Sequence, residues 1–158
     1  MTFEIDKVSL SDIANIFMAI TTFFAATIAF LQYKKSKNEA RDINAKSLYM
    51  DYLKLAFDNP KFSLASYPVE NPRFSQIVVE SDDYCQYEFY VSNLLFAIEE
   101  ILNLADWNNV WEETVIEQLT YHAIYLNSMD FPEHHYDERL LYMREVAIKR
   151  YVGDGGIL

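Results

Sequence analysis

The chain has 158 residues and a formal net charge of −11, and 51% of its residues are apolar, with 12 Tyr and 11 Phe among them. A chain with this much apolar and aromatic material can build a core, which excludes an intrinsically disordered protein. No Lys or Arg occurs between Arg73 and Arg139, where acidic residues run from Glu80 to Glu138. Such a stretch repels phosphate, so we expect no nucleic acid partner.

The first predicted element is a transmembrane helix over Ile13–Tyr33, a segment without any charged residue. A helix of this length spans about 31 Å, close to the hydrocarbon thickness of a bilayer. A signal peptide and a buried core helix are the alternatives. The acidic segment 1–12 has the wrong sign for a signal peptide, and a core helix does not normally need so long an uncharged run. We therefore expect a lipid bilayer as the partner of this segment.

The charges that flank the span predict its orientation. Only Lys7 precedes the span, whereas five cations follow it closely: Lys34, Lys35, Lys37, Arg41 and Lys46. Positively charged flanks stay on the cytoplasmic side of a membrane. We expect a short extracytoplasmic N-terminus over 1–12, and a stalk and cytoplasmic helical domain over 34–158. The expected location is the inner (cytoplasmic) membrane.

Small residues recur at four-residue intervals within the span. This spacing lets two helix backbones approach closely, and threonine can form a hydrogen bond across the contact. Asn15 adds an amide that prefers a partner helix to lipid. The alternative is that all of these side chains face lipid. The contact would make the chain a homo-oligomer, and the residues expected at it are Asn15, Thr21, Thr22, Ala25, Ala26 and Ala29.

The remainder of the chain is predicted to be all-α, with a bundle of about four helices. Glycine and proline are few, and apolar residues recur with helical rather than strand periodicity. Pro60 ends the first of these helices, and the tail over 153–158 is expected to fray. Between helices we expect a loop over 59–80, with a possible extended piece at 76–79. The predicted helices cover 34–58, 82–105, 111–128 and 136–152.

The predicted loop contains a short internal repeat, in which Asp-Asn-Pro-Lys-Phe-Ser at 58–63 is echoed by Glu-Asn-Pro-Arg-Phe-Ser at 70–75. Asn followed by Pro is typical of a helix start, with Asn as the cap and Pro at the first helical position. Two similar turns are enough to explain the repeat. The functional alternative is an anion or ligand contact formed by Lys61 and Arg73.

No motif in the sequence predicts catalysis. His134 and His135 are adjacent and lack the spacing of a helical metal site, so no metal is expected. His122 lies on the apolar face of its helix and is expected to be a hydrogen-bonded core residue. Cys85, the single cysteine, is expected to be a buried and inert thiol. Glycine-rich phosphate loops and nucleophile motifs are absent from the sequence, so we expect no cofactor and no enzyme.

The organisation of the chain resembles that of small bacterial single-pass membrane proteins of uncharacterised function. The resemblance rests on an N-terminal membrane helix, a basic stalk, an aromatic helix that ends near Asn-Pro, and a Tyr-rich helix that ends in paired acids. Some proteins of this build are linked to bacteria–phage conflict, as membrane effectors or exclusion factors. In this sequence the matching segments are Lys34-Lys35, 47–49, 55–60 and 94–101.

Two classes of function follow as expectations. In the first, the chain is a membrane-anchored, oligomeric effector or regulatory protein that couples a cytoplasmic helical domain to the membrane, as the resemblance implies for phage defence. In the second, it is a passive anchor or scaffold that recruits a basic protein through an acidic face. A solvated acidic surface that only aids solubility is the simplest explanation of that face.

Overall fold

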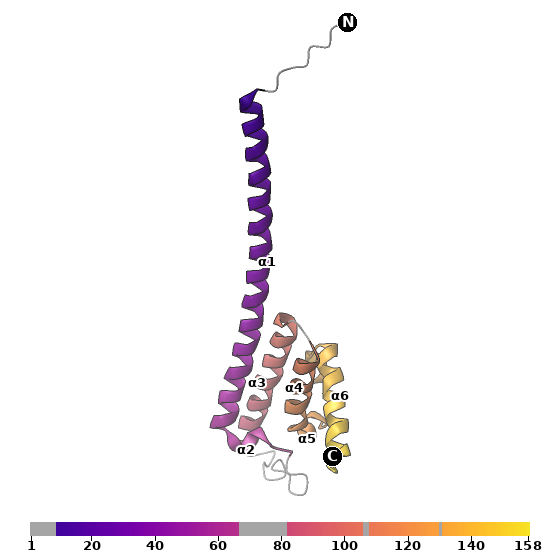
Figure 1. Cartoon of the computed structure of the whole chain (residues 1–158). Coiled ribbons are helices and arrows are strands. Elements are labelled where there is room, and N and C mark those ends of the chain that lie inside the picture. Colours follow the sequence, from indigo (N-terminus) through magenta and orange to yellow (C-terminus); the bar gives the residue numbers. More distant parts are fainter. Residues whose placement is uncertain (1–8, 67–81, 106–107, 130) are drawn as a thin grey trace. The chain divides into compact units, whose positions relative to one another are not determined.

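The computed structural model describes residues 9–66, 82–105, 108–129 and 131–158, and the regular structure in these ranges is helical (Figure 1). The predicted all-α class is therefore confirmed. The chain divides into two compact units, Met1–Ala40 and Arg41–Leu158, which are described separately below. The first helix, α1 (Leu10–Asp58), belongs to both units.

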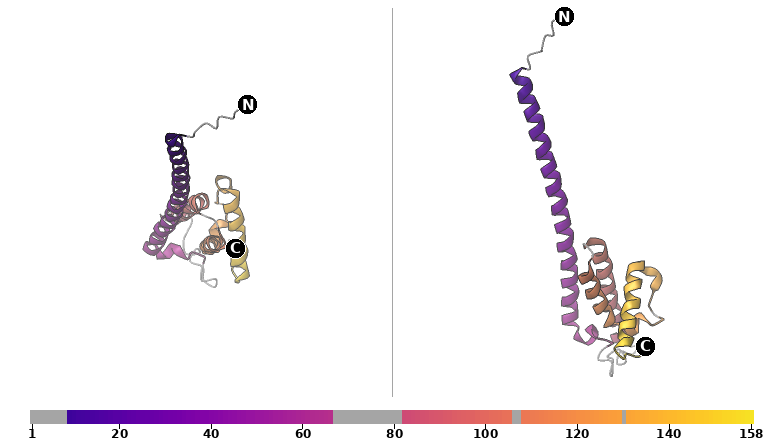
Figure 2. Two further views of the ribbon diagram at one scale, coloured as in Figure 1. Left: turned by 45° about the horizontal axis from the view of Figure 1, so that its top comes forward. Right: turned by 45° about the vertical axis from the view of Figure 1, so that its right-hand side comes forward.

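The second unit, called the C-terminal domain here, contains the end of α1 and the remaining helices. Figures 1 and 2 show α3, α4 and α6 side by side, and α6 packs against both α4 and α5. The predicted helices over 82–105 and 136–152 are confirmed to within two residues at each end. After α1, the helices among the described residues of the domain are α2 (Pro60–Ser63), α3 (Asp82–Leu104), α4 (Asn109–Thr120), α5 (Ala123–Leu126), the 3₁₀ turn η2 (Glu133–His135) and α6 (Glu138–Gly153).

The core of the C-terminal domain is aromatic, as the sequence predicts. Tyr87 of α3 is fully buried and lies against Phe62 of α2 and Tyr125 of α5, with ring centroids 5.7 Å apart in both pairs. Tyr90 contacts Tyr52 of α1, at a centroid distance of 6.0 Å. Rings from four helices therefore meet in one cluster, where tilted and edge-to-face pairs are favourable.

The prediction of a single helix over 111–128 is wrong, because the structure divides this segment into α4 and α5 at Tyr121 and His122. The cause is Ser66, which is fully buried beside the break. Its backbone N–H donates to the Tyr121 carbonyl at 2.9 Å, and its Oγ accepts from the Ile124 N–H at 3.1 Å. A serine from a distant part of the chain thus supplies the hydrogen bonds that a continuous helix would make internally.

The Asn-Pro turn starts as predicted but is capped differently. Pro60 opens α2, yet the Asn59 side chain makes no capping hydrogen bond to it. The Asn59 Nδ2 donates instead to the Leu55 carbonyl at 2.9 Å, which also accepts from the Asn59 backbone N–H at 3.0 Å at the end of α1. The second copy of the repeat at 70–75 and the extended piece at 76–79 lie outside the described residues.

The predicted frayed tail is ordered at its start, so that expectation is wrong. Gly155 has a φ of 94°, a conformation that glycine adopts without a Cβ penalty. The Gly155 N–H donates to the Val152 carbonyl, and the Gly156 N–H donates to the Tyr151 carbonyl, both at 3.0 Å. These two bonds form a Schellman motif that closes α6.

Cys85 is exposed, so the prediction of a buried thiol is wrong. Tyr84 and Tyr87 of the same helix are both buried. Successive residues on a helix are about 100° apart, so Cys85 points away from the side on which those tyrosines pack. The neighbouring tyrosines are buried, and their burial does not extend to Cys85.

Candidate functional site

The N-terminal unit offers one long apolar surface. Every side chain from Ser11 to Tyr33 is exposed, and the helix is long and apolar enough to cross a membrane. Large residues such as Phe17 and Phe23 are 69% and 70% exposed. A core helix would bury such residues against the rest of its own unit. This surface is therefore the first candidate site, and lipid is the solvent that its composition fits.

The six residues expected at a helix–helix contact all lie on exposed positions of α1: Asn15, Thr21, Thr22, Ala25, Ala26 and Ala29. The Thr21 hydroxyl lies within 3.0 Å of the Phe17 and Met18 carbonyls, and the Thr22 hydroxyl donates to the Met18 carbonyl at 2.8 Å. These hydroxyl protons are thus used inside the helix, while the oxygens can still accept from a neighbour. The contact itself stays a prediction.

Of the two residues in the predicted anion contact, Lys61 lies among the described residues. The Lys61 ammonium forms an ion pair with Asp83 at the start of α3 and lies 4.7 Å from the centroid of the Phe62 ring. An anion at Lys61 would have to compete with that carboxylate. Arg73 lies outside the described residues. The Lys61–Arg73 contact therefore stays a prediction.

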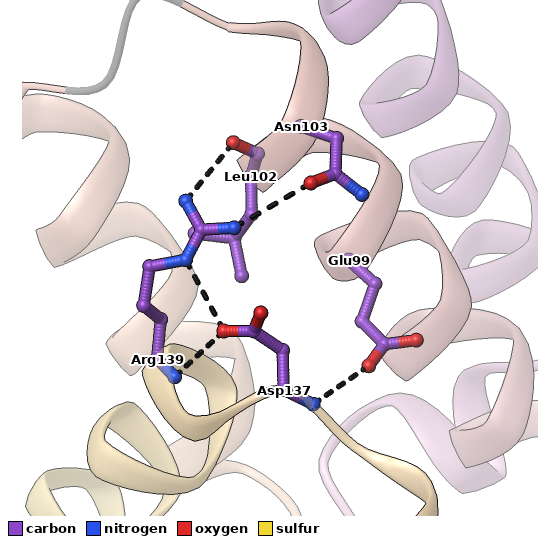
Figure 3. A network of polar contacts seen from close by, with 5 residues as sticks. All are labelled: Glu99, Leu102, Asn103, Asp137 and Arg139. Atoms are coloured by element: carbon purple, nitrogen blue, oxygen red, sulfur yellow. Dashed lines mark hydrogen bonds and ion pairs between the residues drawn. The ribbon is translucent and has the colours of Figure 1, made fainter.

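A polar junction joins the start of α6 to the end of α3 (Figure 3). The Arg139 guanidinium donates to the Leu102 carbonyl at 3.3 Å and to the Asn103 Oδ1 at 3.5 Å, and its Nε lies 3.1 Å from the Asp137 carboxylate. The backbone N–H of Asp137 donates to Glu99 Oε1 at 3.1 Å. We call these five residues the Arg139 junction.

The electrostatics of the Arg139 junction stabilise the helix start. The Asp137 carboxylate accepts from the Arg139 backbone N–H at 2.8 Å and caps α6. That backbone bond, followed by the bond to the guanidinium, lowers the pKa of Asp137. Arg139 is the first cation after the long stretch without Lys or Arg, and that position is the sequence signal that could have identified it.

Beside the Arg139 junction lies an open crevice of about 310 Å³. Its walls are mainly apolar, with two carboxylates and one guanidinium at the rim. The guanidinium already contacts the end of α3, so the polar groups that the rim presents to a ligand are the two carboxylates of Glu112 and Glu138. The junction therefore holds helices together, and the residues lining the crevice are Leu102, Glu112, Glu138, Arg139, Tyr142 and Met143.

His122 is fully buried at the break between α4 and α5, as expected for a core histidine. Its Nδ1 lies 3.0 Å from the Tyr87 hydroxyl oxygen, and its ring packs against Tyr87 and Tyr90. Burial lowers the pKa of His122 to about 3, because the imidazolium form would lose its hydration. His122 is consequently neutral at physiological pH and acts as a packing residue.

A pair of hydrogen bonds connects α1 with the core. The Tyr52 hydroxyl of α1 donates to Gln118 Oε1 of α4 at 3.1 Å and accepts from the Tyr90 hydroxyl at 3.3 Å. Burial raises the pKa of Tyr52, so its hydroxyl keeps its proton and its role as donor. The end of α1 is thus fixed to α3 and α4 by hydrogen bonds as well as by ring contacts.

No group of three or more potential metal ligands occurs among the described residues. The rings of His134 and His135 lie 4.1 Å apart in η2, and both residues are exposed.

Comparison with known proteins gives no relative, since no family model, no curated protein and no solved structure matches the chain. The resemblance to small bacterial membrane proteins therefore stays a prediction.

Proposed function

We propose that the chain is a single-pass protein of the inner membrane, with residues 1–12 outside and the C-terminal domain in the cytoplasm. The exposed apolar surface of α1 from Ile13 to Tyr33 supports the span. The cations that follow it, beginning with Lys34 and Lys35, support the orientation.

We further propose that the protein is a non-catalytic effector or regulator that couples the domain to the membrane. One observation supports this role above others: α1 contains the apolar segment and also contributes Ala45 and Tyr52 to the buried core. Because Tyr52 bonds to both α3 and α4, a shift or rotation of α1 must alter packing inside the domain. Bacteria–phage conflict is the process in which we place it.

A passive scaffold is the second candidate, and the charge distribution favours it. Asp82, Glu117 and Glu138 are exposed carboxylates in the stretch without Lys or Arg, whereas Glu113 is already paired with Arg150 at 2.9 Å. Such a surface attracts a basic protein and speeds its association. In this role the membrane helix needs only hydrophobicity and length.

The two roles are separated by replacing Ile13–Tyr33 with a Leu-rich span of equal length. Bacteria that express the wild-type chain are challenged with a panel of phages, and plaque numbers are compared with those on cells that lack it. We expect fewer plaques with the wild type and loss of this protection with the Leu-rich span, although that variant still fractionates with membranes.

Two outcomes contradict the proposal. Protection that survives the span replacement assigns the chain to the scaffold class. Plaque numbers that the wild type leaves unchanged across the panel rule out the role in phage conflict. As a matched control, Glu117→Gln with Glu138→Gln should weaken recruitment of a basic protein and leave an effector active.

A further inference from the structure

The part of α1 inside the C-terminal domain is apolar on two opposite sides. Its inner side is buried, with Ala45 0% and Tyr52 3% exposed. Ile43, Met50 and Phe57 recur every seven residues and are 64%, 53% and 85% exposed. At about 100° per residue, these three residues lie on the side of the helix opposite Tyr52. We call them the outer stripe.

The outer stripe borders a shallow groove of about 310 Å³, lined by Met50, Leu53, Lys54, Phe57 and Asp58. Met50 and Phe57 line this groove, and Ile43 lies two helical turns before Met50 on the same side of α1. Burying such side chains lowers the free energy, so a contact that covers this side of α1 is favoured.

The spacing and the anchoring indicate what covers it. A seven-residue spacing is that of one of the two core positions in a left-handed coiled coil, and Leu53 is the apolar residue at the second core position between Met50 and Phe57. If the proposed membrane helix anchors both copies, they stand parallel with their outer stripes at the same depth, where the two stripes can face each other. This is the self-complementary contact of a two-fold dimer.

The same register continues through the predicted span. Counting back from Ile43 in steps of seven gives Ser36, Ala29, Thr22 and Asn15. Three of these are residues already expected at a helix–helix contact in the membrane. Small side chains suit close packing in lipid, and large apolar ones suit a contact in water.

The charges beside the outer stripe permit two copies to approach, although the whole chain is strongly acidic. Lys46 pairs with Asp42 at 2.6 Å, and Lys54 pairs with Asp51 at 2.9 Å. These two pairs balance the charges beside Ile43 and Met50 within each chain, and the repulsion that remains between two copies comes from Asp58 at the end of the groove.

We propose that Ile43, Met50 and Phe57 pack against the same residues of a second copy, in a parallel α1–α1 seam just outside the membrane. The proposal rests on the membrane anchoring proposed above. It adds a contact surface in the aqueous part of the chain, next to the one expected between the spans.

Disulfide cross-linking in isolated membranes tests this seam with the full-length chain. In a Cys85→Ser background, Met50→Cys is compared with Asp51→Cys, an exposed neighbour about 100° away on α1. Under mild oxidation we expect Met50→Cys to give a covalent dimer and Asp51→Cys to stay monomeric. Adding Phe57→Glu to Met50→Cys should reduce the dimer at least severalfold, without loss of folding since Phe57 is largely exposed.

The two proposals fail in different ways. A chain that is absent from the membrane fraction contradicts the anchoring. A chain that is present there, but gives no dimer from Met50→Cys or equal dimer from Asp51→Cys, overturns the seam and leaves the anchoring intact. A Met50→Cys chain that is protected from oxidation by another protein also overturns it.

Discussion

His122 shows how burial sets the chemistry of a single residue. The sequence predicts a hydrogen-bonded core residue on an apolar helix face. The structure confirms the burial and shows Tyr87 as the hydrogen-bond partner, although His122 lies at the break between α4 and α5. Its pKa falls from 6.5 in the unfolded chain to about 3 in the folded one. Between these pH values the unfolded chain binds a proton at His122 that the folded chain does not bind. The free energy of unfolding therefore falls as the pH is lowered from 6.5 toward 3.

We predict that His122→Gln reduces this acid sensitivity. Gln keeps a polar group for Tyr87 and does not titrate. The wild-type domain should lose about 3 kcal/mol more stability than His122→Gln between about pH 7 and pH 4. Denaturant unfolding of the full-length chain in detergent micelles measures the difference, with tryptophan fluorescence as the signal.

The matched control is His135→Gln, because His135 is exposed. That variant should follow the wild-type pH dependence. Equal pH dependence of His122→Gln and the wild type would show that His122 does not titrate as a buried base.

At the scale of elements, sequence periodicity located most of the helices in the described ranges, because each has enough apolar residues on one face to define its phase. It missed the break between α4 and α5, since the cause is Ser66, far away in the chain. It also missed the closure of α6. That closure depends on a positive φ at Gly155. A glycine just after the end of a helix is typical of such a C-cap and could have predicted it.

The end of α6 offers a paired test of this closure. Gly155→Ala forces a Cβ into the left-handed region and should destabilise the domain by about 1–2 kcal/mol. Gly153 is helical, and a Cβ there would meet nothing within 4 Å, so Gly153→Ala should stabilise the domain by about 0.5 kcal/mol. The free energy of unfolding of each full-length variant in micelles measures both effects. A destabilisation of equal size in the two variants would contradict the Schellman motif.

At the scale of the whole molecule, the fold class was predictable and the candidate sites only in part. The uncharged run from Ile13 to Tyr33 is a composition signal that a sequence shows directly. The Arg139 junction and the outer stripe were not found, because they depend on which face of a helix the other helices cover. Phe57 and Tyr52 look alike in the sequence, yet one is exposed and the other is buried.

The central claim is that α1 anchors the chain in the membrane with the C-terminal domain in the cytoplasm. Cys85 tests it most directly, because it is the single cysteine and is exposed on α3. Cells that express the full-length chain are treated with a membrane-impermeant maleimide, before and after permeabilisation, with Cys85→Ser as the unlabelled control. We predict that Cys85 of the membrane-bound chain is labelled only after permeabilisation, whereas labelling in intact cells would contradict the topology.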